Sequence, residues 1–239
     1  MASDGSRRTL LVSTATAAGW LAATACGSGL PHARAADEAK GDEAKEDVSA
    51  NEDLMREHGA LDRLLLVYEA GVARAAQEPP VAQAIHHAAE LVSSFIEQYH
   101  EKLEEDFIFP LLEKAQRHVS EVRTLRSQHV AGRAVTQAIL QLTAPAGAVD
   151  APALTQAVQA FVRMYRPHAA REDTIIFPTL HEVASPAQLA ELGERFEDVE
   201  HQRFGKEGFE SIVRQVEELE RALGTYELAQ FTPTAFGAH

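Results

Sequence analysis

The chain has 239 residues, of which 45% are hydrophobic and 24% are charged, and its formal net charge is −14. This length and composition are typical of a soluble globular protein with one sizeable core. The negative charge, without any cluster of Lys and Arg, argues against a nucleic-acid partner, because phosphate contacts need basic side chains. A single cysteine, Cys26, excludes an internal disulfide and a metal site built from several thiolates.

Residues 1–35 predict an export signal. Two arginines, Arg7 and Arg8, precede a short apolar stretch, and an Ala-Arg-Ala sequence at 33–35 fits a signal-peptidase cleavage pattern. The segment Ser-Arg-Arg-Thr-Leu-Leu resembles a twin-arginine signal, which would carry a folded protein to the periplasm. An ordinary secretory signal is the alternative. Cleavage before Cys26 would instead give a membrane-anchored lipoprotein.

Residues 36–50 consist mostly of alanine and charged side chains, without an apolar stripe. Such a composition buries too little apolar surface to fold alone, so this segment is predicted to be a solvated linker.

Four amphipathic stretches follow between residues 51 and 182. In each, apolar residues recur at alternating spacings of three and four, which is the period of an α-helix with one buried face. Short connections that contain Pro or Gly join them, and no run alternates in the manner of a strand. The pattern predicts an all-α, up-down four-helix bundle. Asn51 or Asp53 is expected to cap its first helix.

One inward position in each stretch is a histidine where Leu or Ile is usual. Two of these histidines are followed four residues later by a glutamate, and that spacing places both side chains on one helix face. Burying so many polar groups without partners costs about 1–3 kcal/mol each, and a metal ion removes that cost by accepting their lone pairs. The candidate metal ligands are therefore His58, His100, Glu104, His129, His168 and Glu172.

The two His-x-x-x-Glu segments belong to an internal repeat. Residues 99–112 read YHEKLEEDFIFPLL and residues 165–180 read YRPHAAREDTIIFPTL. Each copy runs into Phe-Pro, and the prolines, Pro110 and Pro178, are expected to stop their helices. Two helical hairpins with pseudo-two-fold symmetry would place two carboxylates between two metal ions about 3.5–4 Å apart.

These residues resemble the hemerythrin-like, or HHE cation-binding, family over residues 51–180. The resemblance implies a non-haem centre of two iron ions held by the six side chains named above, with Glu104 and Glu172 bridging. The family's oxygen carriers place the last carboxylate one residue later, where this chain has Asp173. The analogy with Glu104 favours Glu172 over Asp173.

One position departs from the oxygen carriers of the family. They have a second histidine four residues after the one on the third helix, and here that position is Arg133. Arginine offers only donors and cannot bind a cation. Reversible oxygen transport is therefore not expected. Gly132, in a core position without a side chain, is expected to leave space beside the metal.

Two classes of function remain open at such a centre. The first is a protein that binds metal and a small ligand such as oxygen, peroxide or nitric oxide, for sensing, scavenging or iron holding. The second is an oxidoreductase that reduces peroxide or nitric oxide, or oxidises ferrous iron, so whether the protein is an enzyme is left open. Zinc or manganese, or a mononuclear site, are alternatives because histidine and carboxylate ligands suit several metals.

Other histidines and the chain after the repeat complete the expectations. His86 and Glu90 repeat the His-x-x-x-Glu spacing but lie about 21 Å up the helix from His100, and are interpreted as a solvated face. Residues 183–239 are predicted to form a helical extension and a tail, with a helix capped by Ser185 and another ended by Gly224.

Overall fold

The structure is a computed structural model, and it describes residues 49–145 and 147–233. The predicted export signal, Cys26 and nearly all of the linker lie outside these residues. Within them the regular elements are all helical. The four long segments are α1 (Ala50–Gly71); the succession α2 (Pro79–Leu91), η1 (Val92–His100), α3 (Glu101–Leu103), η2 (Glu104–Ile108) and α4 (Phe109–Lys114); α5 (Val119–Leu142); and the succession α6 (Ala151–Arg171), η3 (Glu172–Ile176) and α7 (Phe177–Val183).

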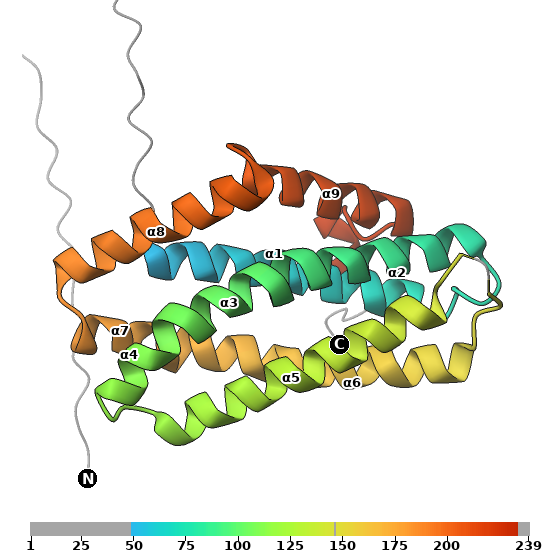
Figure 1. The fold of residues 1–239 in the computed structure, drawn as a ribbon. Coiled ribbons are helices and arrows are strands. Elements are labelled where there is room, and N and C mark those ends of the chain that lie inside the picture. Colours follow the sequence, from blue (N-terminus) through green and yellow to red (C-terminus); the bar gives the residue numbers. More distant parts are fainter. Residues whose placement is uncertain (1–48, 146, 234–239) are drawn as a thin grey trace, which may run out of the picture. The chain divides into compact units, whose positions relative to one another are not determined.

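These four segments form the predicted up-down bundle (Figure 1). α1 packs against α2 and α6, and α5 packs against α6 and α2. Their inward faces form one core, in which the largest fully buried side chains include Tyr68, Phe95, Phe109, Phe161 and Phe177. Burying each such side chain stabilises the fold by about 1.5–3 kcal/mol. This stabilisation offsets the cost of burying polar groups in the same bundle.

The first helix begins two residues earlier than expected. Its N-cap is Ser49, whose hydroxyl accepts from the backbone N–H of Glu52, while the Glu52 carboxylate accepts from the backbone of Ser49. This reciprocal capping box satisfies two donors that a helix start leaves free, and so displaces Asn51 and Asp53 from that role. Asn51 instead donates a 2.9 Å hydrogen bond to the carbonyl of Phe177 on α7.

Three stretches, η1, η2 and η3, are π-helical. Such wide turns hold one more residue than an α-turn and are frequent at functional sites. The expectation that Pro110 and Pro178 stop their helices is wrong. Each proline sits in the first turn of a new α-helical stretch, α4 or α7, directly after a π-helical one. A proline is tolerated at a first turn because its missing N–H is not needed there.

A helical pair, α8 (Pro186–Phe204) and α9 (Gly208–Leu223), follows the bundle as predicted, with Ser185 as N-cap and Gly224 in a left-handed conformation after α9. Figure 1 shows both helices lying along α1, on the side away from α5 and α6. α9 packs on α1 and α2, and Arg63 of α1 forms an ion pair of 2.6 Å with Glu220 of α9. A short 3-10 turn, η4 (Leu228–Phe231), ends the described chain.

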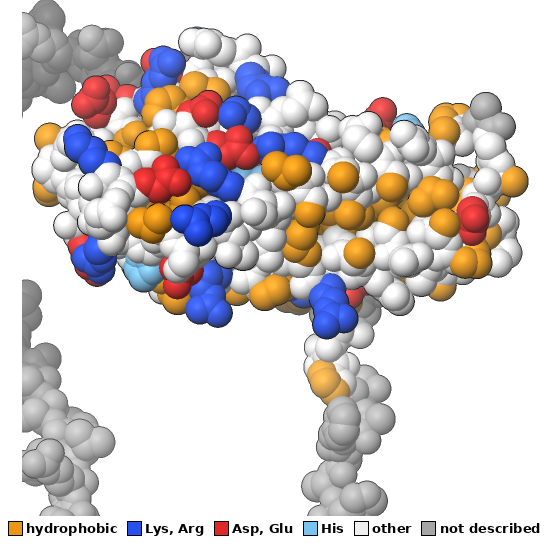
Figure 2. All heavy atoms as spheres, turned by 60° about the horizontal axis from the view of Figure 1, so that its bottom comes forward, with side chains coloured by type: hydrophobic (Ala, Val, Ile, Leu, Met, Phe, Trp, Pro, Cys, Tyr) orange, Lys and Arg blue, Asp and Glu red, His pale blue; other side chains and the backbone are white. Residues whose placement is uncertain are grey.

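The surface of the α5–α6 hairpin is unevenly charged. Between residues 134 and 162 the sequence has one charged side chain, Asp150, whereas the residues around the histidines of both helices are rich in Arg, Glu and Asp. Figure 2 shows this contrast as one half of a face rich in charged side chains and another half with few of them. None of the helices in the described residues is both long and apolar enough to cross a membrane.

Candidate metal centre

All six predicted ligands converge inside the bundle. Each long segment contributes one histidine, and the glutamates begin the wide turns η2 and η3. Each of the six residues is at most 4% exposed. They fall into two overlapping groups that could each hold a metal ion: His58, His100 and Glu104, and His129, His168, Glu104 and Glu172.

The histidines meet in pairs through their Nε2 atoms. Nε2 of His58 lies 3.0 Å from Nε2 of His100, and Nε2 of His129 lies 3.3 Å from Nε2 of His168. We call the first pair site A and the second pair site B. With the ring proton on Nδ1, the two Nε2 atoms of each pair are close enough to bind one cation together.

The two glutamates lie between the pairs. Glu104 has Oε1 at 3.6 Å from Nε2 of His100 and Oε2 at 3.4 Å from Nε2 of His129, so it reaches both sites with different oxygens. Glu172 has Oε2 at 3.0 Å from Nε2 of His168 and 3.5 Å from Nε2 of His58. Both carboxylates are therefore placed to bridge two ions.

The carboxylate oxygens themselves test whether a metal fits. All four oxygens of Glu104 and Glu172 are buried and have no hydrogen-bond partner among the described residues. Leaving a buried polar group unpaired costs about 1–3 kcal/mol, and more when it is charged. Cations bound between the two histidine pairs would satisfy these oxygens, so the residues present fit a pair of metal ions.

Each histidine is held from behind through its other ring nitrogen. Nδ1 lies 2.7 Å from Asp173 in His58, 2.7 Å from Glu57 in His100, 3.1 Å from Glu105 in His129 and 2.9 Å from Gln128 in His168. An oxygen acceptor at Nδ1 fixes the proton there and leaves the Nε2 lone pair free for a metal.

None of these four supports was predicted from the sequence, where Asp173 was considered only as an alternative ligand, but one signal indicates them. Glu57 and Gln128 each directly precede the first histidine of a hairpin, while Glu105 and Asp173 each directly follow a candidate ligand. The repeat therefore includes the supporting residues as well as the ligands. Glu172 and Asp173 have different positions, since Glu172 faces the centre and Asp173 contacts Nδ1 of His58 from behind.

Burial sets the protonation of the cluster. It lowers the pKa of His100 well below its usual range, helped by the three neighbouring histidines, and it lowers the pKa of His129 against the effect of Glu105. Burial and then the charge of Glu172 raise the pKa of Glu104 well above its usual range. Burial opposes ionisation of Glu172, but His168, His58 and His129 together lower its pKa. The lowered pKa values of His100 and His129, beside a carboxylate whose pKa is also lowered, favour the forms of these groups that bind a cation.

Arg133 points away from the sites. Its guanidinium lies 2.7 Å from both Glu101 and Glu105, on the Nδ1 side of His129. Arg133 thus holds the carboxylate that holds His129. Burial raises the pKa of Glu101 to about 8, against the smaller lowering effects of the hydrogen bond from Tyr165 and of the charge of Arg133. Arg133 provides no lone pair to either site.

The expected space beside Gly132 is absent. A Cβ atom added there would lie 2.2 Å from the hydroxyl of Tyr165 and 2.8 Å from its ring. Tyr165 fills the position and donates a 2.5 Å hydrogen bond to Glu101. The glycine allows the ring of a neighbouring helix to pack closely, and the expectation of a cavity was wrong for that reason.

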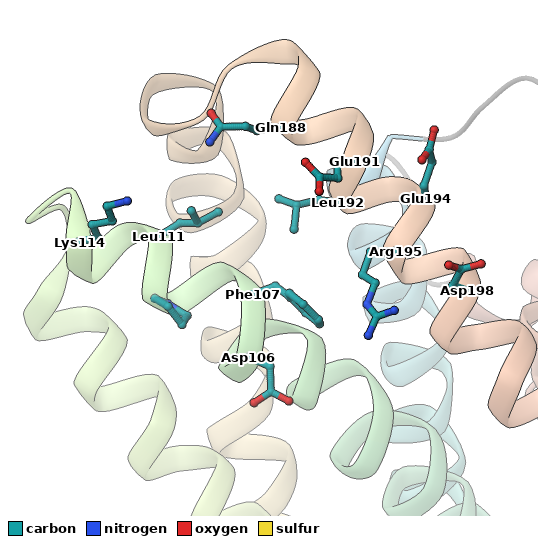
Figure 3. A pocket seen from close by; sticks show the side chains of 11 residues that line it. Asp106, Phe107, Leu111, Lys114, Gln188, Glu191, Leu192, Glu194, Arg195 and Asp198 are labelled. Carbon is teal, nitrogen blue, oxygen red and sulfur yellow. The ribbon is translucent and has the colours of Figure 1, made fainter.

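A groove of about 620 Å³ lies elsewhere, between α8 and the η2–α4 stretch (Figure 3). Phe107, Leu111 and Leu192 supply apolar side chains, and Arg195 extends toward Phe107. None of the six candidate ligands lines this groove. His86, the other histidine with a glutamate four residues later, bonds Thr143 at 3.0 Å and is not part of the cluster.

Together, a four-helix bundle and a buried histidine–carboxylate cluster define a cation-binding helical protein. The family model described as hemerythrin HHE cation binding domain matches residues 49–180, more than half of the chain, and the chain belongs to this family. Uncharacterized proteins of Mycobacterium bovis and Mycobacterium tuberculosis are 44% identical over 232 residues, covering 95% of this chain and 91% of theirs. That similarity therefore extends into the sequence beyond the family domain. No solved structure matches.

Proposed function

We propose that the protein holds two iron ions, one at site A and one at site B, bridged by Glu104 and Glu172. The observation that carries this proposal is the set of four buried carboxylate oxygens without partners, surrounded by four Nε2 atoms. Membership of the hemerythrin family supports iron. Zinc and manganese remain alternatives, since imidazole and carboxylate ligands suit them as well.

We propose further that the centre binds a small ligand such as oxygen, peroxide or nitric oxide. Two histidines and shared carboxylates per ion resemble the ligand sets that leave positions open on ferrous iron. Bound iron would supply the electrons and the open position for such a ligand. The chain's own residues orient the imidazoles through Nδ1 and keep bulk water from a centre whose members are at most 4% exposed.

Oxidoreductase activity at the same centre is the second candidate, and Arg133 favours it. Its guanidinium is engaged by Glu101 and Glu105, so position 133 adds no nitrogen ligand. A centre with fewer nitrogen ligands than an oxygen carrier is better suited to reacting with a small oxidant than to releasing oxygen unchanged. The reactions considered are reduction of peroxide or nitric oxide and oxidation of ferrous iron.

Metal content and the optical spectrum separate these classes. Protein purified without oxygen is expected to contain two iron ions per chain, and its spectrum is expected to change on addition of oxygen or peroxide. A reversible change without turnover supports ligand binding, and sustained consumption of the oxidant supports catalysis. Purified protein that takes up no metal from ferrous, manganous or zinc salts would contradict the proposal.

We also propose that the protein acts after export to the periplasm. The support is the Arg7–Arg8 pair ahead of an apolar stretch, in residues that the structure does not describe. Replacing both arginines with lysine is expected to leave the protein in the cytoplasm if the twin-arginine route is used. Unchanged export would indicate the general secretory route, and a membrane-bound product lost in Cys26→Ser would show lipidation.

A further inference from the structure

The four supports behind the histidines follow the symmetry of the repeat. In each hairpin, the residue before the first histidine supports the second histidine: Glu57 supports His100 and Gln128 supports His168. The carboxylate after each bridging glutamate supports the first histidine of the other hairpin, through Glu105 and Asp173. Each hairpin therefore supports a histidine of the other hairpin through an equivalent residue.

This symmetry is broken where Glu57 corresponds to Gln128. Both histidines of site A have carboxylate oxygens at Nδ1, at 2.7 Å each. At site B, His168 has only the neutral amide oxygen of Gln128, at 2.9 Å.

The remaining support of site B is also weakened. Glu105, behind His129, shares its charge with Lys102 at 2.9 Å and with Arg133 at 2.7 Å. A carboxylate at Nδ1 raises the basicity of the coordinating nitrogen, and it does so less when other cations already neutralise it. The imidazoles of site B are therefore weaker donors toward a cation than those of site A.

We propose that the two metal positions have unequal affinities, with site A binding its ion more tightly, and that Gln128 is the positioning residue that makes site B the weaker and more exchangeable one. This rests on the proposed function only in requiring that metal binds. The difference lies in the supports behind the histidines, since each site has two histidines and shares the two glutamates.

The surface next to site B supports exchange there. A cavity of about 330 Å³ between α5 and α6 is lined by Gln128 and His168, together with Thr124, Pro167 and Arg171. Gln128 and the histidine that it supports therefore both border this cavity. Water and small ions that enter this cavity approach site B from the side of Gln128, the uncharged one of its two supports.

Stepwise metal binding tests the proposal. Metal-free protein would be titrated without oxygen with ferrous iron and with cobalt(II), following bound ions by native mass spectrometry and cobalt(II) by visible absorption. Two steps at least tenfold apart in affinity are expected. His58→Ala should remove the tight step and His129→Ala the weak one.

Charge variants then test the cause. Gln128→Glu should tighten the weak step by about tenfold, and Glu57→Gln should weaken the tight step by about 10–100-fold, the usual effect of changing a support behind a metal ligand. Gln137→Glu, an exposed change of the same kind on α5, should leave both steps unchanged and serves as the matched control.

Equal affinities, loss of the tight step in His129→Ala, or a Gln128→Glu variant that behaves like Gln137→Glu would each overturn the inference. In each of these cases the wild-type protein still binds two ions, so the proposed function stays intact. A wild-type protein that binds no ion would instead reject the proposed function itself.

Discussion

The two hairpins of the bundle carry the same ligands in different surroundings. Where the first hairpin has Leu61 in its core, the corresponding position of the second is Gly132, filled by the Tyr165 ring. Where the first has Glu101, buried and bonded to Tyr165, the second has Ala169. The candidate ligands are therefore the same in both hairpins, whereas the side chains that pack around them differ.

Removing one of the two glutamates that reach both sites should have the largest effect. Glu104→Gln takes away the one that reaches the two sites with different oxygens, and we expect the variant to bind less than one ion per chain. Wild-type protein should gain stability from metal, by about 4 kcal/mol when free metal is 1,000 times the dissociation constant. Thermal unfolding with and without chelator measures both effects.

The metal-free form of this variant gives the control. The pKa of Glu104 is raised by burial, so its ionisation opposes folding without metal. Metal-free Glu104→Gln should therefore be at least as stable as the metal-free wild type. Glu90→Gln, an exposed change on α2, should bind two ions. If metal-free Glu104→Gln were strongly destabilised, the role of Glu104 would be structural.

A packing substitution should sharpen the contrast between the hairpins. Gly132→Ala would bring a Cβ atom within 2.8 Å of the Tyr165 ring, and overpacking of this kind costs about 1–3 kcal/mol. Urea unfolding would measure the loss of stability.

Gly59, on α1 of the first hairpin, is a control glycine on the same bundle. A Cβ atom there meets nothing within 4 Å, so Gly59→Ala should leave stability unchanged or raise it by about 0.5–1 kcal/mol. Equal effects of the two substitutions would show that Tyr165 can move aside at little cost.

The last effect concerns pH. Burial raises the pKa of Glu101 to about 8, above the 4.5 of a free glutamate. Between these values the folded state holds a proton on Glu101 that the unfolded state has lost, so the contribution of Glu101 to the stability of metal-free protein falls as pH rises from about 4.5 to 8. Glu101→Gln should flatten this slope. A slope unchanged by the substitution would show that Glu101 is ionised in the folded state.

The sequence predicted the bundle, because a helical period is a local signal repeated over four long stretches. It also brought together six side chains that the fold does place in one cluster, because the repeat marks them twice. It did not predict the roles of Glu57 and Gln128, since each faces a histidine on another segment of its hairpin, and only packing shows that contact. The expectation of empty space beside Gly132 was wrong for the same reason, because the ring that fills this space comes from a different helix.

The extension α8–α9 has a consequence for hydrogen exchange and for the route of metal loading. α9 packs its buried face on α1 and α2 and is tied there by the Arg63–Glu220 pair, so the first hairpin cannot open without detaching it. The α5–α6 hairpin lies on the other side of the bundle. Local unfolding follows the least protected elements. Amides of α5 and α6 should therefore exchange before those of α1 and α2, and an ion could be replaced while the first hairpin stays folded.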